Sequence, residues 1–173
     1  MDRGPKRLVE LEDIVWEAVL DSREPILDAV LHTHLALEAL LIEMLEPGLN
    51  SRAALRASFP DKTKRLVNTK RITENQKIAY DRLNDARNDI AHTFGLSIDA
   101  EWLLQLARDL EAAGIDFSDS MGHYTVEEAL EYHNGFRGLM AEICWCVLYD
   151  AGYTLMELGG RDIFSATDRR TEN

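Results

Sequence analysis

The amino-acid sequence predicts an all-α fold, an up-and-down helical bundle of about five helices with short extra helical turns. Apolar residues recur at spacings of three and four over long stretches, which is the pattern of helices with one face in a core. No stretch alternates apolar and polar residues as a half-buried strand does, and the 173 residues include only four prolines and ten glycines. We therefore expect one helical domain over residues 1–173, with 160–173 as a loosely ordered tail.

Two helices are predicted in the N-terminal part of the chain. Apolar residues at helical spacing indicate an amphipathic helix over 8–20. A second helix is expected to begin after Asp21 or Ser22, with Pro25 in its first turn, and to continue until Pro47-Gly48 stops it. Because this second helix carries apolar residues on more than one side, we expect it at the centre of the bundle.

Two pairs of closely spaced residues resemble ligand or redox pairs, but their spacing argues against both functions. His32 and His34 are two residues apart on a helix and face different directions, whereas a chelating pair on a helix is four residues apart. Surface or hydrogen-bonded core histidines are therefore expected, and no metal site. Cys144 and Cys146 also point to different sides of a helix, which favours core or interface thiols.

The middle of the chain contains short helical pieces followed by a well-marked helix. Short helices are predicted over 51–58 and 62–67, separated by Phe59-Pro60-Asp61. Thr73, followed three residues later by Gln76, forms a capping-box pattern that fixes the start of the next helix. Gly95 is expected to end it.

The helix between Thr73 and Gly95 has the clearest chemical signal in the sequence. One side is apolar and is expected to face the core: Ala79, Leu83, Ala86 and Ile90. The opposite stripe is polar and carries groups that bind or titrate: Tyr80, Asn84, Arg87, Asn88 and His92. The last two residues of this stripe are four apart and therefore neighbours on the helix surface. A candidate site is thus expected in the last two turns, where the helix dipole favours a protonated imidazole.

Two further helices complete the predicted bundle. The first begins at Ser97 or Asp99 and ends at Gly114, with a buried stripe formed by Trp102, Leu103, Leu106 and Leu110. A second capping box, Thr125 with Glu128, opens one long helix that continues to Gly159-Gly160. Gly135 and Gly138 inside this helix predict a kink or a close helix crossing.

The charge of the chain is unevenly distributed. The formal net charge is -12, which disfavours a nucleic-acid partner for the molecule as a whole. Residues 52–71, however, contain seven basic residues and one acidic residue, a net of +6 that leaves -18 elsewhere. Four of these cations are candidate substrate-binding residues on a basic rim beside Arg87 and His92: Lys64, Arg65, Lys70 and Arg71. A solvated connector that happens to be basic remains the alternative.

Neither a signal peptide nor a membrane span is expected. The N-terminal basic residues are followed by LVELEDIVWE, whose carboxylates do not belong in the apolar part of a signal peptide. No window approaches the length of apolar sequence that crosses a bilayer. We expect a cytoplasmic protein without a membrane partner.

The segment RNDIAH at 87–92 resembles the signature of the HEPN superfamily, in which an arginine, often followed by a polar residue such as asparagine, precedes a histidine by a few positions late in a helix of a small bundle. The surrounding LNDARNDIAHTFG is also similar to the corresponding helix end of that superfamily. In general character the resemblance extends from Leu27 to Phe94. Within the superfamily, the sequence is also similar to mannitol operon repressor-like and other small stand-alone members.

This resemblance implies a metal-independent endoribonuclease that needs no cofactor, with a site completed by two protomers. His92 would act as general base or acid, and Arg87 would bind the phosphate oxygens. Asn88 would orient the histidine or the phosphate, while Tyr80 and Asn84 would contact sugar or base. The expected partners are a second copy of the chain, RNA as substrate and an antitoxin or regulatory protein, as in a toxin-antitoxin or antiviral defence system.

Two alternatives remain open at the level of sequence. The first is structural: Arg87 pairs with Asp89 or with an acid of a neighbouring helix, and His92 caps its own helix through backbone carbonyls. The second is a non-catalytic, dimeric regulator that binds a nucleotide, a nucleic acid or a protein in the same cleft. The strongly acidic remainder of the chain suits a protein partner better than RNA.

Overall fold

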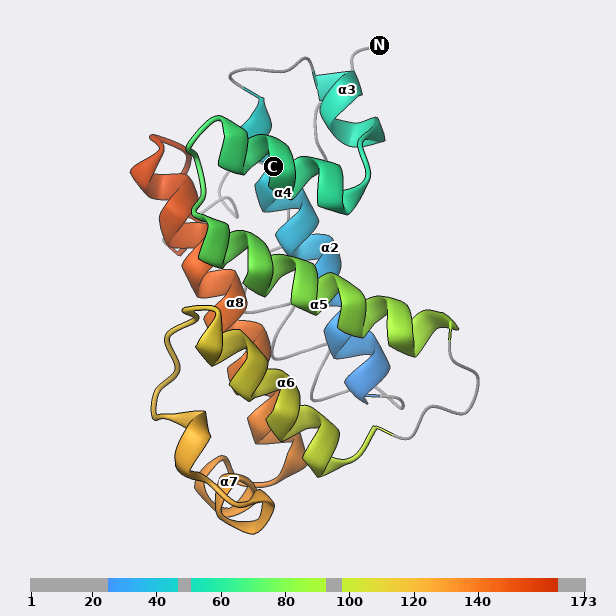
Figure 1. The fold of residues 1–173 in the computed structure, drawn as a ribbon, viewed down its shortest axis with the longest axis vertical. Coiled ribbons are helices and arrows are strands. Elements are labelled where there is room, and N and C mark those ends of the chain that lie inside the picture. Colours follow the sequence, from blue (N-terminus) through green and yellow to red (C-terminus); the bar gives the residue numbers. More distant parts are fainter. Residues whose placement is uncertain (1–24, 47–50, 93–97, 165–173) are drawn as a thin grey trace, which may run out of the picture.

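The computed structural model describes residues 25–46, 51–92 and 98–164, which form an all-α bundle (Figure 1). No strand occurs in these ranges, so the predicted fold class is confirmed. The helices, in chain order, are α2 (Pro25–Leu45), α3 (Ser51–Arg56), α4 (Phe59–Asn68), α5 (Glu74–His92), α6 (Ala100–Ala112), the 3₁₀ turn η2 (Met121–His123), α7 (Val126–Tyr132) and α8 (Phe136–Glu157). The helix predicted over 8–20 and its neighbours Asp21 and Ser22 lie outside the described residues.

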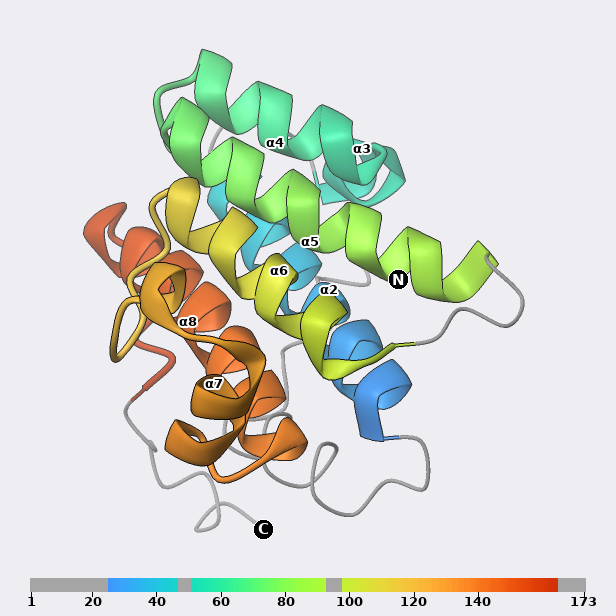
Figure 2. The ribbon, with the colours of Figure 1, turned by 60° about the horizontal axis from the view of Figure 1, so that its bottom comes forward.

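Helix α2 lies at the centre of the bundle, as predicted. It packs against α8, α4, α5 and α3, and its side chains Leu37, Leu40 and Leu41 are fully buried. Helix α6 packs against α5 and α8 (Figure 2), and α7 lies below α6 and α8 at one end of the bundle (Figure 1). None of the described helices combines the length and hydropathy that crossing a bilayer requires.

Local capping chemistry sets several helix starts. Thr73 and Gln76 form the predicted reciprocal pair: the Thr73 N–H donates to Gln76 Oε1 at 2.9 Å, and the Gln76 N–H donates to Thr73 Oγ1 at 3.1 Å. Asp99 caps α6 by accepting the Trp102 N–H at 2.9 Å. The predicted capping box of Thr125 and Glu128 is also present.

The expected separation of two short helices by Phe59-Pro60-Asp61 is wrong. These three residues form the first turn of α4, and Ser58 is the N-cap, with its hydroxyl accepting the Asp61 N–H at 3.3 Å. Proline is tolerated in a first helical turn because its missing N–H would have no partner there. Pro60, which would interrupt a helix if it lay in its interior, is therefore compatible with the first turn of α4.

The long helix predicted from Thr125 to Gly159-Gly160 is two helices. Asn134 and Gly135 have positive φ values of 57° and 96°, which interrupt the helix between α7 and α8. Gly138 then packs so closely that a Cβ atom there would lie 1.6 Å from the His133 carbonyl oxygen. The sequence predicted a kink or a close helix crossing at these glycines; the structure has a break between two helices at Gly135 and a close backbone approach at Gly138.

Part of the predicted C-terminal tail is held in place. Arg161 forms two hydrogen bonds with the Glu43 carboxylate of α2, at 2.9 and 3.0 Å. Phe164 packs its ring against Tyr149 and Tyr153 of α8. The expectation of a loose tail is therefore wrong for residues 161–164, and residues 165–173 lie outside the described chain.

Candidate functional site

The apolar face of α5 is confirmed. Ala79, Leu83 and Ala86 are fully buried, and Ile90 is partly buried against the same core. The helix ends at His92, so the candidate site does lie in its last two turns. The side chain of His92, and the predicted terminator Gly95, lie outside what the structure describes.

Tyr80 is not on an open polar stripe, contrary to the sequence-based prediction. Its side chain is fully buried, and its hydroxyl donates to Asp150 Oδ2 of α8 at 2.5 Å. Burial, and then the nearby Asp150 carboxylate, raise the pKa of Tyr80 well above its ordinary value, so the phenol stays protonated. Gln76 extends this network by donating from Nε2 to Thr154 Oγ1 at 2.8 Å. The role of Tyr80 is thus to join α5 to α8.

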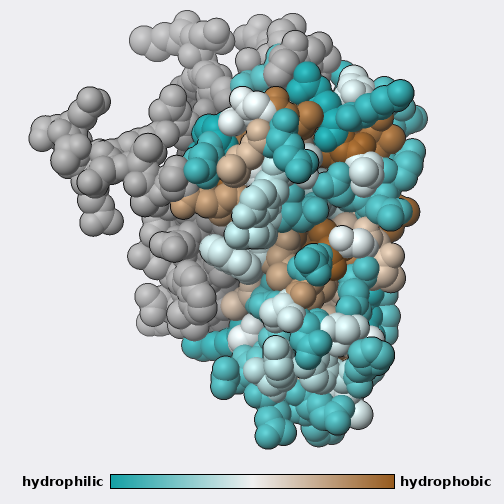
Figure 3. Space-filling model, turned by 90° about the vertical axis from the view of Figure 1, so that its left-hand side faces the viewer, coloured by the Kyte–Doolittle hydropathy of each residue, from teal (hydrophilic) through white to brown (hydrophobic). Residues whose placement is uncertain are grey.

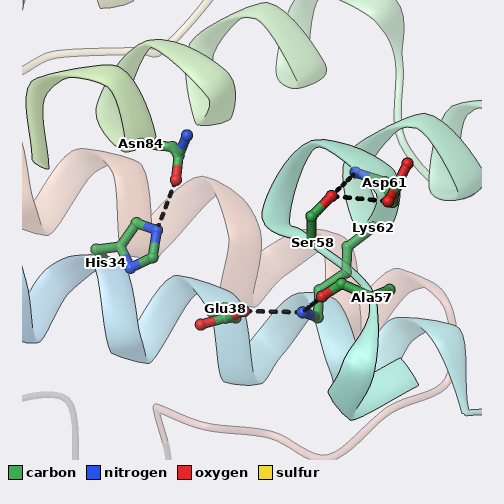
Figure 4. Close-up of polar contacts among 7 residues, drawn as sticks. All are labelled: His34, Glu38, Ala57, Ser58, Asp61, Lys62 and Asn84. Atoms are coloured by element: carbon green, nitrogen blue, oxygen red, sulfur yellow. Dashed lines mark hydrogen bonds and ion pairs between the residues drawn. The ribbon is translucent and has the colours of Figure 1, made fainter. Parts of the chain in front are cut away.

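Asn84 is also buried and is held by a histidine of α2. The neutral His34 ring donates from Nε2 to Asn84 Oδ1 at 3.0 Å, and it stacks on Phe59 with ring centroids 4.8 Å apart (Figure 4). Burial lowers the pKa of His34 in spite of this hydrogen bond, which keeps the ring uncharged. The predicted hydrogen-bonded core histidine is confirmed, whereas the open position predicted for Asn84 is wrong.

His32 behaves as the other kind of histidine expected from the sequence. Its ring is exposed, and Nδ1 lies 2.7 Å from the Asp28 carbonyl oxygen one turn earlier on α2. Cys144 and Cys146 are buried free thiols, as expected, and burial raises the pKa of Cys144 to about 12. No group of three potential metal ligands comes together among the described residues.

A buried lysine, Lys62, lies near His34, and the sequence did not lead us to expect it. Lys62 of α4 is completely buried and donates from Nζ to Glu38 Oε1 of α2 at 2.8 Å, and also to the Ala57 carbonyl oxygen (Figure 4). A signal was present, because Phe59, Lys62, Thr63 and Leu66 follow the helical spacing of a buried face. We counted Lys62 as part of a basic surface, but its charge is neutralised within the bundle.

Arg87 and Asn88 lie one turn beyond Asn84, near the C-terminal end of α5. Both side chains are partly exposed, and Arg87 Nη1 donates to Asn88 Oδ1 at 3.0 Å. No carboxylate of residues 25–46, 51–92 or 98–164 forms an ion pair with Arg87. The alternative in which Arg87 is paired with Asp89 or with an acid of another helix is therefore not observed in these ranges.

Two of the four cations predicted as a basic rim, Lys70 and Arg71, lie away from Arg87 within one chain. Lys64 and Arg65 are exposed on α4, and Lys70 and Arg71 precede the start of α5. Arg71 donates from Nη1 to the Met44 carbonyl oxygen at 2.8 Å, at the end of α2. Arg87 is thirteen residues beyond the first residue of α5, which corresponds to about 20 Å along the helix axis. The prediction of a single rim is wrong for Lys70 and Arg71.

Two grooves are formed on the face where α8 meets the segment after α6. The first has a volume of about 580 Å³ and is lined mainly by aromatic and acidic residues of α8 and of 114–118. The second, of about 560 Å³, includes Lys70, Arg71 and the start of α5 in its lining. Neither groove is lined by Arg87 or Asn88, so the predicted catalytic residues and the grooves are separate features of the molecule.

Comparison with known proteins adds no identity to this description. No family model matches the chain, and no curated protein and no solved structure shows detectable similarity to it. Fold and site together define a helical bundle with an arginine-asparagine pair near the end of α5. Any statement about function therefore depends on the chemistry of these side chains.

Proposed function

We propose that the protein is a metal-independent endoribonuclease that acts as a homodimer, with Arg87, Asn88 and His92 in a composite site. The observation that carries the proposal is the state of Arg87. Its guanidinium is partly exposed, hydrogen-bonded to the Asn88 amide at 3.0 Å and without a carboxylate partner in the described ranges. A guanidinium in this state keeps donors for an incoming phosphate.

The chemistry follows from the reactivity of RNA. Its 2′-hydroxyl is an internal nucleophile, so cleavage requires proton transfer and stabilisation of the negative charge that develops on the phosphate. In the proposal His92 removes or supplies the proton, and Arg87 donates two hydrogen bonds to the phosphate oxygens. Asn88 aligns the guanidinium, through the hydrogen bond already present in the free chain.

The shortage of proton-transfer groups supports a dimer. The motif contains one histidine, whereas cleavage through the 2′-hydroxyl requires both an acid and a base. Two copies that meet across a twofold axis supply two histidines and two arginines to one cleft. The dimer belongs to the proposal and is tested with it.

RNA cleavage in the presence of EDTA tests the proposal. The wild-type protein is expected to cut single-stranded RNA and to leave cyclic phosphate ends. His92→Ala and Arg87→Ala are each expected to lower the rate about a hundredfold or more. His123→Ala and Arg56→Ala, which alter an exposed histidine and an exposed arginine elsewhere, serve as matched controls. Equal rates for wild type, His92→Ala and Arg87→Ala would refute the assignment.

A second candidate function is a non-catalytic, dimeric module that binds a nucleotide, a nucleic acid or a partner protein through Arg87, Asn88 and His92, without Tyr80 or Asn84. The burial of Tyr80 and Asn84 favours it, because both residues were expected to contact the RNA and neither is accessible in the free chain. The two functions differ in cells. Growth arrest on expression, relieved by Arg87→Ala, supports a ribonuclease toxin, whereas partner binding without growth arrest supports the module.

A further inference from the structure

The larger groove described above lies between α8 and residues 114–118, on the face shown in Figure 3. Apolar residues and residues of intermediate hydropathy gather over the middle of this face, with hydrophilic residues around them (Figure 3). The volume of about 580 Å³ lies within the range of small-molecule sites. The groove therefore has the size to hold a ligand, and its lining defines what kind.

One wall of the groove is a column of aromatic rings. Trp145, Tyr149 and Tyr153 follow each other at intervals of four residues on α8, with centroids 5.7 and 4.7 Å apart along the column. Tyr149 and Tyr153 remain 37% and 45% exposed, although both rings also contact Phe164. Phe117 completes the lining from the opposite segment. Aromatic faces attract cations and apolar alkyl chains.

Among the residues that the structure describes, the charged groups of the lining are all acidic. Glu142 and Asp150 lie on α8 beside the aromatic column, and Asp116 lies on the other side, while no lysine, arginine or histidine of the described chain lines the groove. Burial alone would raise the pKa of Glu142, but hydrogen bonds from Ser118 reverse that effect and lower the pKa. Glu142 is therefore ionised at neutral pH. Glu142 thus gives the groove a fixed negative charge beside its aromatic surface, whereas burial raises the pKa of Asp150.

The spacing of the carboxylates defines an elongated ligand. Glu142 and Asp150 are eight residues apart on α8, which corresponds to about 12 Å along the helix axis. They are too dispersed for one metal ion, in keeping with the lack of a three-ligand cluster in the described ranges. A linear chain with a cationic group near each end could contact both carboxylates, with its methylene groups lying along Tyr149.

We propose that this groove binds a linear aliphatic polyamine, with its ammonium groups near Glu142 and Asp150 and its alkyl chain against Trp145, Tyr149 and Tyr153. The site is independent of the proposed ribonuclease site at the end of α5. It gives the acidic bundle a specific cation ligand in addition to diffuse counterions.

Titration calorimetry with spermidine at fixed ionic strength tests the proposal. The wild-type protein is expected to show saturable binding, and the monoamine butylamine is expected to bind about tenfold or more weakly because it can reach only one carboxylate. Glu142→Gln should weaken spermidine binding about tenfold or more, while its amide oxygen still accepts the Ser118 N–H. Glu131→Gln, an exposed acid on α7, is the matched control and should leave binding unchanged.

A second pair of variants separates a specific site from general attraction. Tyr153→Ser removes one ring of the column, and Tyr132→Ser removes an exposed tyrosine on α7 outside the groove. Weaker binding by Tyr153→Ser alone supports the site. The proposal is overturned if wild-type protein shows no saturable binding, or if Glu142→Gln and Glu131→Gln weaken binding equally, as diffuse attraction by the net charge predicts.

Discussion

At the scale of single residues, His34 links the pH to the stability of the fold. Burial lowers the pKa of its imidazole below the ordinary value of 6.5, which the unfolded chain retains. As the pH falls through 6.5, the unfolded chain takes up a proton that the folded chain does not. The free energy of unfolding therefore decreases from about pH 6.5 down to the lowered pKa of the folded state, by at most about 1.4 kcal/mol per pH unit for this group.

We expect His34→Gln to flatten this pH dependence. The measurement is urea unfolding between pH 7.5 and 5.5 for the wild type, for His34→Gln and for His32→Gln, whose ring is exposed on the same helix. The His34→Gln curve should have the smallest slope, although its absolute stability will also be lower because Asn84 loses its partner. Burial also lowers the pKa of His133, which leaves a residual slope of the same sign. Parallel curves for wild type and His34→Gln would contradict the expectation.

Residue positions that depend on local sequence could be predicted, and those that depend on distant partners could not. The core face of α5 follows from helical spacing alone. Tyr80 was placed on the polar stripe because a phenol is compatible with both environments, and its partner Asp150 is 70 residues away. Lys62 was counted as a surface cation because its partner, Glu38 of α2, is also distant in sequence. Sequence spacing assigns a face to a residue but does not provide its tertiary partner.

At the scale of elements, Gly138 determines how α8 begins. In an ordinary helix interior, replacing glycine with alanine stabilises the fold by about 1 kcal/mol. Here a Cβ atom would lie 1.6 Å from the His133 carbonyl oxygen, which is backbone and cannot move aside without disturbing the α7–α8 turn. We therefore expect Gly138→Ala to destabilise the protein by about 1–3 kcal/mol, the opposite sign to its helix propensity.

Thermal or urea unfolding measures this effect. The matched control is Ala141→Gly, three residues later in the same helix, which should cost about 1 kcal/mol through propensity, in addition to the packing lost with a partly buried methyl group. A stabilising Gly138→Ala would mean that the turn relaxes freely and that the close approach has no energetic role.

The same contrast explains which element boundaries could be predicted. The starts at Thr73, Asp99 and Thr125 were correct because a cap and its partner lie within three residues of each other. The break at Asn134 and Gly135 was missed because apolar residues continue at helical spacing on both sides, although Asn-Gly is a local turn signal and the turn is closed by the local hydrogen bond from the Gly135 N–H to the Leu130 carbonyl oxygen. Pro60 was misassigned because proline either ends a helix or occupies its first turn, and the Ser58 cap decides which.

At the scale of the whole molecule, composition and periodicity were sufficient for the fold class and for the central position of α2. They were not sufficient to predict where the charged side chains lie in the folded protein. The positive window at 52–71 appeared contiguous in sequence, but the structure buries Lys62 and directs Arg71 to the end of α2. The chain reverses direction between α4 and α5, so Lys70 and Arg71, which lie in the turn, are at the opposite end of α5 from Arg87.

The proposed dimer predicts that two inactive variants restore part of the activity when they form a heterodimer, which a site within one chain does not allow. If the ribonuclease site is shared between protomers, an arginine from one copy can serve the histidine of the other. A heterodimer of Arg87→Ala with His92→Ala, isolated with two different affinity tags, keeps one histidine and one arginine in the cleft. It should be much less active than wild type, because one imidazole must serve in turn as base and as acid, but more active than either variant homodimer, which lacks one of the two groups altogether.

The control is a heterodimer of wild type with the double variant Arg87→Ala/His92→Ala, which also holds one arginine and one histidine but on the same chain. A shared cleft predicts comparable activity for both heterodimers, because only the number of groups in the cleft matters. A site confined to each chain predicts activity for the control and none for the first heterodimer. That second outcome would reject the composite site while leaving the catalytic assignment of Arg87 and His92 intact, so the assembly and the chemistry are tested separately.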